Sequence, residues 1–229
     1  DPVPSATYDN GKLMLLPGRD YKIEGSNDEL IISYKHDDKT TGTSAGDAKG
    51  TVTLDNTNIK SVDTDATVKI SGNATVNGDV KADNVEVAAG TGTVNVTGNV
   101  SADNVSISSG TITVSEGINA DSDVTITGGT ISVTGTDGKA AISANKVDIA
   151  GGTVEATGGS GAAAIEGTEN VAIRGVVKLS VNSSKNSDGS IVAAISSKAI
   201  TVEDTVDIKA NDSAKDKLFS VTQIGRASC

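Results

Sequence analysis

The chain has 229 residues and is strongly acidic, because 30 Asp and Glu against 19 Lys and Arg give a formal net charge of −11. This charge argues against nucleic acid or an anionic membrane surface as a partner, since both attract a basic protein surface. Only 2% of the residues are aromatic, so the core must consist of smaller side chains such as Val, Ile and Ala. The single cysteine, Cys229, excludes an intrachain disulfide and a cysteine-based metal site. No apolar run approaches the ~18 residues of a membrane span.

Residues 1–49 differ in composition from the rest, because they contain all three tyrosines, the only methionine and the only histidine. Apolar stretches at 13–16, 21–23 and 30–34, separated by turn residues, predict three short strands. We expect these strands to form a small antiparallel β unit, with an Ig-like module as one option, that serves as a cap or separate module. The polar segment 36–50 is expected to be a loop or linker.

From residue 50 onward, apolar residues recur in three columns with a period of about 20 residues. In the first two columns they come as pairs separated by one residue, which is generally polar, as on a strand with one buried face. The first column is Val52/Leu54, Val68/Ile70, Val85/Val87, Val105/Ile107, Val124/Ile126, Val147/Ile149, Val171/Ile173 and Ile200/Val202; the second is Val94/Val96, Ile112/Val114, Ile131/Val133, Val154/Ala156, Val177/Leu179 and Val206/Ile208; the third is Val80, Val100, Ile118, Ile142, Ile165 and Ile195.

Such self-similarity is typical of a β-solenoid. We predict an all-β fold in which residues 50–215 form a right-handed parallel β-helix with three faces and roughly seven or eight coils. A Greek-key sandwich is the alternative, but it would not keep so steady a period. Residues 216–229 are expected to be a C-terminal cap and tail, in which Leu218, Phe219 and Val221 cover the open end of the helix.

The spacing between coils widens toward the C-terminus, and the extra residues fall in turns such as 134–138 and 182–190. Insertions in a solenoid lie in loops on one side, which is often the binding side. The lysines Lys139, Lys146, Lys178 and Lys185 occur in this part of the chain, so they are the candidate ligand-binding residues. The competing interpretation is that these lysines are only solvated surface charges.

Carboxylates recur at one corner of the expected helix, at Asp83, Asp103, Asp121 and Asp123. Stacked at the spacing of successive strands, they repel one another unless a cation or hydrogen bonds intervene. Calcium, which prefers oxygen ligands, is therefore a candidate cofactor at this corner. The alternative is that these side chains satisfy backbone groups in turns.

Catalysis is not expected. Acid–base chemistry needs carboxylates clustered with a basic group, yet His36 lies in the polar loop before the solenoid and Arg174 is the only arginine within it. Arg174 is expected to form a surface salt bridge. A threonine column at Thr93, Thr111, Thr130 and Thr153 is interpreted as a structural ladder rather than an ice-binding surface, because it breaks in later coils.

Two segments, GGTISVTGTDGKAAISA (128–144) and GGTVEATGGSGAAAIEG (151–167), resemble β-helical repeats of secreted and cell-surface proteins of Gram-positive bacteria, and a pectate-lyase-like family of carbohydrate-binding domains. Near the N-terminus, Asn10-Gly11-Lys12, Pro17-Gly18 and Asp20-Tyr21 resemble a repeat of Gram-positive surface proteins. The resemblance implies an extracellular protein that binds acidic polysaccharide through calcium held by carboxylates of the coils.

Two hypotheses of different class follow. In the first, the chain is a structural or adhesive rod in a larger surface protein, with a polysaccharide or a host or cell-surface protein as partner. In the second, it is a calcium-dependent carbohydrate-binding module for acidic polysaccharide. The absence of aromatic residues from 50–215 favours the first hypothesis, since sugar binding usually relies on aromatic platforms. The acidic corner favours the second.

Overall fold

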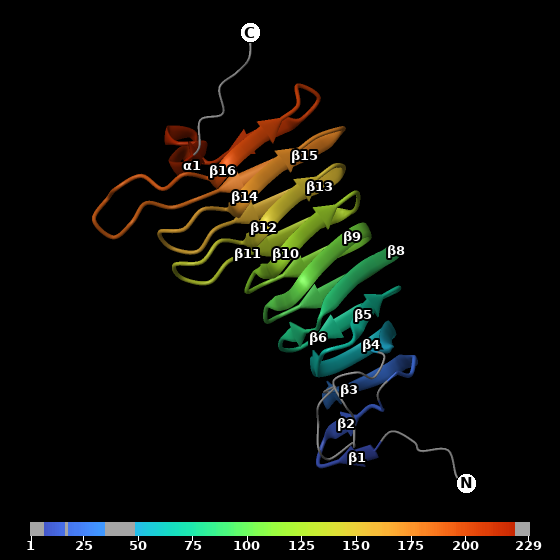
Figure 1. Ribbon diagram of the computed structural model, residues 1–229. Helices are drawn as coiled ribbons and strands as arrows, with labels where there is room; N and C mark the ends of the chain where they lie inside the picture. Colours follow the sequence, from blue (N-terminus) through green and yellow to red (C-terminus); the bar gives the residue numbers. More distant parts are fainter. Residues whose placement is uncertain (1–6, 17, 35–48, 223–229) are drawn as a thin grey trace.

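The computed structural model describes residues 7–16, 18–34 and 49–222, and it is nearly all β. Figure 1 shows the strands stacked as successive rungs of an elongated column, with β1 at one end and α1 near the other. The strands are β1 (Thr7–Asp9), β2 (Lys12–Met14), β3 (Tyr21–Tyr34), β4 (Thr51–Thr64), β5 (Thr67–Ile70), β6 (Ala74–Val76), β7 (Val80–Lys81), β8 (Asn84–Val96), β9 (Val100–Val114), β10 (Ile118–Ile126), β11 (Thr130–Thr134), β12 (Ile142–Ile149), β13 (Gly152–Thr157), β14 (Ile165–Ile173), β15 (Val177–Asn182), β16 (Ile195–Val202), β17 (Asp207–Ala210) and β18 (Phe219–Val221). One short helix, α1 (Asp212–Asp216), precedes β18. No helix in the described ranges is long and apolar enough to cross a membrane.

The first predicted column is confirmed as a stack of parallel strands. Its rungs pair in the order Val52, Val68, Val85, Val105, Val124, Val147, Val171 and Ile200. The third column is confirmed in the same way, with the order Val62, Val80, Val100, Ile118, Ile142, Ile165, Ile195 and Phe219. The fold is therefore a solenoid-like stack of parallel strands.

The second column follows the prediction as far as Val154 and then departs from it. Val154 pairs with Leu179 and Ala156 with Val181, whereas the sequence pattern placed Val177 and Leu179 at these positions. Val177 instead lies opposite Gly152. The prediction was wrong by two residues because apolar side chains alternate from Val177 to Val181, so a shift of two keeps every one of them on the buried face.

The interior of the stack is made of the predicted column residues. The predicted column residues between Val124 and Ile173 are at most 1% exposed, as at Ile126, Ile149 and Val154. Burying a Val or Ile side chain contributes about 1.5–3 kcal/mol, and the parallel ladders satisfy the backbone between coils. A narrow interior filled by branched and small side chains explains how the chain folds with so few aromatic residues.

The N-terminal region differs from the expected antiparallel unit. Only β1 and β2 pair antiparallel; β2 pairs parallel with β3, and β3 pairs parallel with β4. Tyr21 and Ile23 lie in register with Val52 and Leu54, so the stack of parallel strands begins before residue 50. The pattern of apolar residues misled the prediction because alternation is the same in parallel and antiparallel strands. Most of the predicted linker lies outside the described residues, as does the tail after Thr222.

Candidate functional site

The turns that connect the second stack to the third lengthen toward the C-terminus, as the sequence predicted. Residues 135–141, 158–164 and 183–194 form these loops, and Figure 1 shows them extending from one side of the column. Successive loops are joined by backbone hydrogen bonds, from Gly138 N to Ser160 O at 2.9 Å and from Gly159 N to Lys139 O at 3.0 Å. The loops therefore form a continuous wall rather than independent projections.

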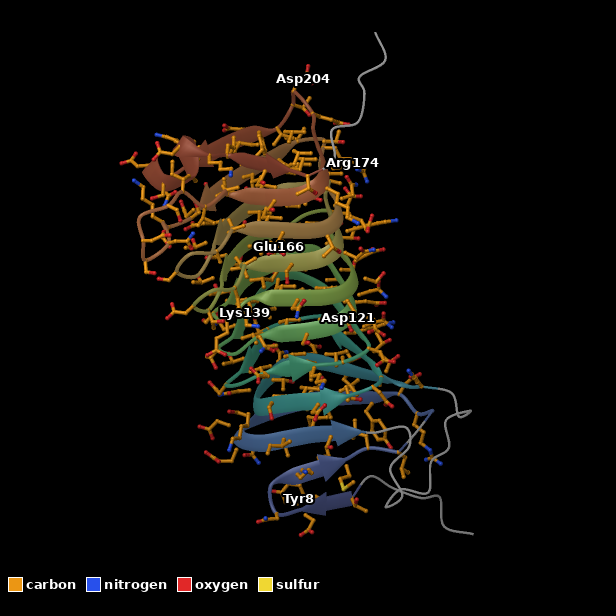
Figure 2. All side chains as sticks on the ribbon, turned by 60° about the vertical axis from the view of Figure 1, so that its left-hand side comes forward. Tyr8, Asp121, Lys139, Glu166, Arg174 and Asp204 are labelled. Atoms are coloured by element: carbon orange, nitrogen blue, oxygen red, sulfur yellow. The ribbon has the colours of Figure 1, made fainter. Side chains whose placement is uncertain are left out.

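A groove with a volume of about 410 Å³ lies beside the first of these long loops. Its lining combines the loop with outward-facing residues of the third stack and of the shorter turns in earlier coils: Asn99, Ser101, Glu116, Gly117, Ile118, Asn119, Thr136, Gly138, Lys139, Ala140, Ser143 and Glu166. Figure 2 shows Lys139 on the side of the protruding loops, whereas Asp121 and Arg174 lie along the opposite edge.

The groove is polar and carries charges of both signs. Ser143 Oγ donates a hydrogen bond to Asn119 Oδ1 at 3.1 Å, which orders part of its surface. Lys139 supplies a cation, and Glu116 and Glu166 supply carboxylates. Hydroxyl, amide, ammonium and carboxylate groups in one groove suit a hydroxylated ligand that carries some charge.

Lys139 is the one predicted ligand-binding lysine that lines this groove. Lys185 lies in the loop of residues 183–194, on the same side of the column. Lys146 belongs to β12 in the first stack and Lys178 to β15 in the second, so the four lysines do not share one face. Residues on strands of different stacks point in different directions, which separates Lys146 and Lys178 from the long loops.

The acidic corner lies between the third stack and the first, where Asp83 occupies a bend before β8 and where Asp103 and Asp121 lie within β9 and β10. Asp103 N donates a hydrogen bond to Asp83 O at 2.8 Å, which places these two residues on successive coils. Burial raises the pKa of Asp103, and the neighbouring carboxylates of Asp83 and Asp121 raise it further. The predicted repulsion within a stack of carboxylates is therefore present at Asp103.

Lys49, which the sequence interpretation did not include, forms an ion pair with Asp83. The side-chain hydrogen bond between Lys49 and Asp83 raises the pKa of Lys49 above its ordinary value, and the charges of Asp65 and Asp103 raise it further. The corner thus contains its own cation at one end of the carboxylate row. Sequence spacing gave no sign of this pair, because 34 residues separate its members.

The fourth predicted calcium ligand, Asp123, lies in β10, two residues after Asp121 and directly before the buried Val124 of the first stack. It lies in register with Asn104 on one side and Lys146 on the other, and it accepts a hydrogen bond from Ser122 Oγ at 3.4 Å. Within residues 7–16, 18–34 and 49–222, no group of three or more His, Cys, Asp or Glu side chains converges as a metal site would require. The corner offers calcium adjacent carboxylates rather than a closed cage of ligands.

The other residues considered from sequence have structural partners. Arg174 forms a bidentate ion pair with Asp148, in which Nε and Nη2 each donate to a carboxylate oxygen at 3.0 Å. This pair confirms the expected salt bridge. The threonines Thr93, Thr111, Thr130 and Thr153 stack in register as predicted, and the next residue in the ladder is Lys178. His36 lies outside the described residues.

The groove was only partly foreseen from the sequence, which identified Lys139 and the long loop but not the opposite side. A usable signal is the residue after each apolar member of the third column, because Ser101, Asn119, Ser143 and Glu166 occupy that outward position on successive strands. Together these features define a class of protein, an all-β solenoid-like stack with a polar groove along one side. Comparisons of the chain with protein-family models, with curated proteins and with solved structures gave no match.

Proposed function

We propose that the chain is a non-catalytic extracellular module, a right-handed parallel β-helix with three faces that serves as a rigid structural or adhesive rod within a larger surface protein. The observation that carries this proposal is the uninterrupted register of the first stack from Val52 to Ile200, over a predominantly apolar interior. Each rung is held to the next by backbone hydrogen bonds, so bending or stretching the rod requires breaking many of them together.

The rod predicts fixed distances between rungs. Positions on the outward face of the first stack follow one another in the order Lys69, Glu86, Ser106, Thr125, Asp148, Ala172 and Thr201. At ~4.8 Å per rung, spin labels at Lys69 and Thr201 should be about 29 Å apart along the axis, and labels at Ser106 and Thr201 about 19 Å apart.

The experiment uses double cysteine variants in a Cys229→Ser background and measures the distances by pulsed electron paramagnetic resonance. Two narrow distributions that differ by about 10 Å are expected. Broad distributions, or equal mean distances, would contradict a rigid rod. A melting curve of each variant controls for loss of fold.

A second candidate function is calcium-dependent binding of acidic polysaccharide, and the groove beside residues 135–141 favours it. An extended sugar polymer fits a polar groove that runs past several coils, and Lys139 can pair with a carboxylate on such a polymer. Calcium would bind separately, at the acidic corner on the opposite edge of the column, where a divalent cation would reduce the repulsion among Asp83, Asp103 and Asp121.

Retention on immobilised acidic polysaccharide, measured with calcium and then with chelator, tests this second function. Lys139→Ala should weaken retention, whereas Lys178→Ala, which removes an equal charge outside the groove, should not. Retention that persists in chelator would contradict the calcium step. Equal effects of the two substitutions would contradict the groove.

A further inference from the structure

Among the described residues, apolar side chains at the C-terminal end of the stack are more exposed than those of the central coils. Phe219 and Val221 lie directly over Ile195 and Ser197, and they are 39% and 43% exposed where Ile195 is fully buried. Apolar residues at the same end of the other two stacks, Ile200, Val202, Val206, Ile208 and Ala210, are only partly buried, as is Leu218 directly before β18. Within the part of the chain that the structure describes, the predicted plug of Leu218, Phe219 and Val221 covers this end only partly.

The strand edge at this end is also open. Among the described strands, β17 pairs with β15 on one side only, and residues 199–202 of β16 pair only with β14. A hollow of about 490 Å³ lies beside this edge, lined by Ile208, Lys209, Ala210, Lys215 and Leu218. An edge with free backbone groups next to apolar side chains favours the addition of another strand.

The sequence of β17 is self-complementary when it is read against itself in the antiparallel direction. With Ile208 opposite Ile208 of a second copy, Asp207 stands opposite Lys209 and Lys209 opposite Asp207. The same register aligns the partly buried Val206 with Ala210. Opposite charges thus meet on the outward face and apolar side chains meet on the inward face, which is the favourable arrangement for cross-strand pairs.

We propose that this end is a self-association surface, at which two copies of the chain join through antiparallel pairing of their β17 strands about a twofold axis. The axis passes between the two Ile208 residues, so each copy contributes the same surface. The pairing continues the sheet across both molecules and joins the two open interiors. This inference concerns the end of the stack and does not depend on any ligand of the groove.

Charge reversal tests the register directly. In Lys209→Asp, Asp207 would face an aspartate of the second copy, and in Asp207→Lys, Lys209 would face a lysine. Each variant alone should dimerise at least about tenfold more weakly than the wild type in sedimentation equilibrium, since two attractive pairs become repulsive. Mixing the two variants restores both pairs, so the mixture should form a heterodimer with near wild-type affinity.

Glu155→Lys serves as the matched control, because it reverses a charge on the same face two strands away from the edge, where its neighbours in register are Ser132 and Ser180. It should leave dimerisation unchanged, and melting curves of all variants report any loss of fold. A wild-type chain that stays monomeric at the highest attainable concentration overturns the proposal. A dimer that is indifferent to both reversals, or variants that do not recover on mixing, overturns the register.

Discussion

Gly159 offers the sharpest test of how closely the coils are stacked. It is buried in the loop of residues 158–164, and a Cβ added to it would lie 1.7 Å from Thr136 O and 2.3 Å from the Thr136 carbonyl carbon. Both are backbone atoms of the loop one coil below, which would have to retreat by more than about 1 Å to reach an ordinary contact. Gly159→Ala is therefore expected to lower the free energy of unfolding by about 3 kcal/mol, at the upper end of the cost of overpacking.

For a protein of this size the loss corresponds to a fall in melting temperature on the order of 5–10 °C, measurable by circular dichroism. Gly138→Asn is the control in the neighbouring loop. Gly138 has φ +73°, which Asn tolerates, and nothing lies within 4 Å of its added Cβ, so the change should be within about 0.5 kcal/mol. Should Gly159→Ala melt together with the wild type, the loops would not be stacked as closely as described, and the groove wall they form would be in doubt.

Three further predictions concern the core and the acidic corner. Ile126→Ala leaves a cavity at a fully buried position and should lower the free energy of unfolding, measured by urea denaturation, by about 2–5 kcal/mol. Thr125→Ala on the outward face should lower it by no more than about 0.5 kcal/mol. Equal losses would contradict the assignment of faces. Asp103→Asn should raise the melting temperature by about 1–2 °C at neutral pH. The folded-state pKa of Asp103 is raised above the unfolded one, so its charge destabilises the fold above the folded pKa, and the penalty disappears as the pH falls below the unfolded pKa. The advantage of Asp103→Asn should vanish in that acidic range, and a variant less stable than the wild type at neutral pH would show that the carboxylate is stabilised instead. Calcium should raise the melting temperature of the wild type by a few degrees and that of the double variant Asp103→Asn, Asp121→Asn by less; an unchanged wild-type melt would remove the calcium hypothesis.

The apolar columns could be predicted almost completely from the sequence in the central coils. Between Val85 and Ile173 each coil has one apolar pair or single residue per strand, and glycine marks many of the turns, so only one register buries every apolar residue. The prediction failed where this condition fails. At Val177, Leu179 and Val181 three alternating apolar residues compete for two positions, and the pattern cannot choose between registers that differ by two.

The N-terminal strands show a different limit. Tyr21 and Ile23 alternate with polar residues as the later rungs do, and Gly18 and Gly25, both at positive φ, lie on either side of them. Their composition suggested a separate module, whereas their register continues the stack. Composition reports which side chains fill a coil and says little about which strand pairs with it. The boundary near residue 50 remains a prediction about domains rather than about strand pairing.

The groove was harder to predict than the core because it is made by differences between coils. Its floor comes from outward residues that any coil possesses, and its wall exists because residues 135–141 are longer than the corresponding turns after Val96 and Val114. The sequence shows the insertion but not which side chains of the preceding coils it overhangs, since these lie about 20 to 40 residues away along the chain. In a solenoid the repeat determines the core, while departures from the repeat determine where a ligand can bind. Lys139 and Glu116, placed together by one long loop and one short turn, are therefore the first positions at which binding should be sought.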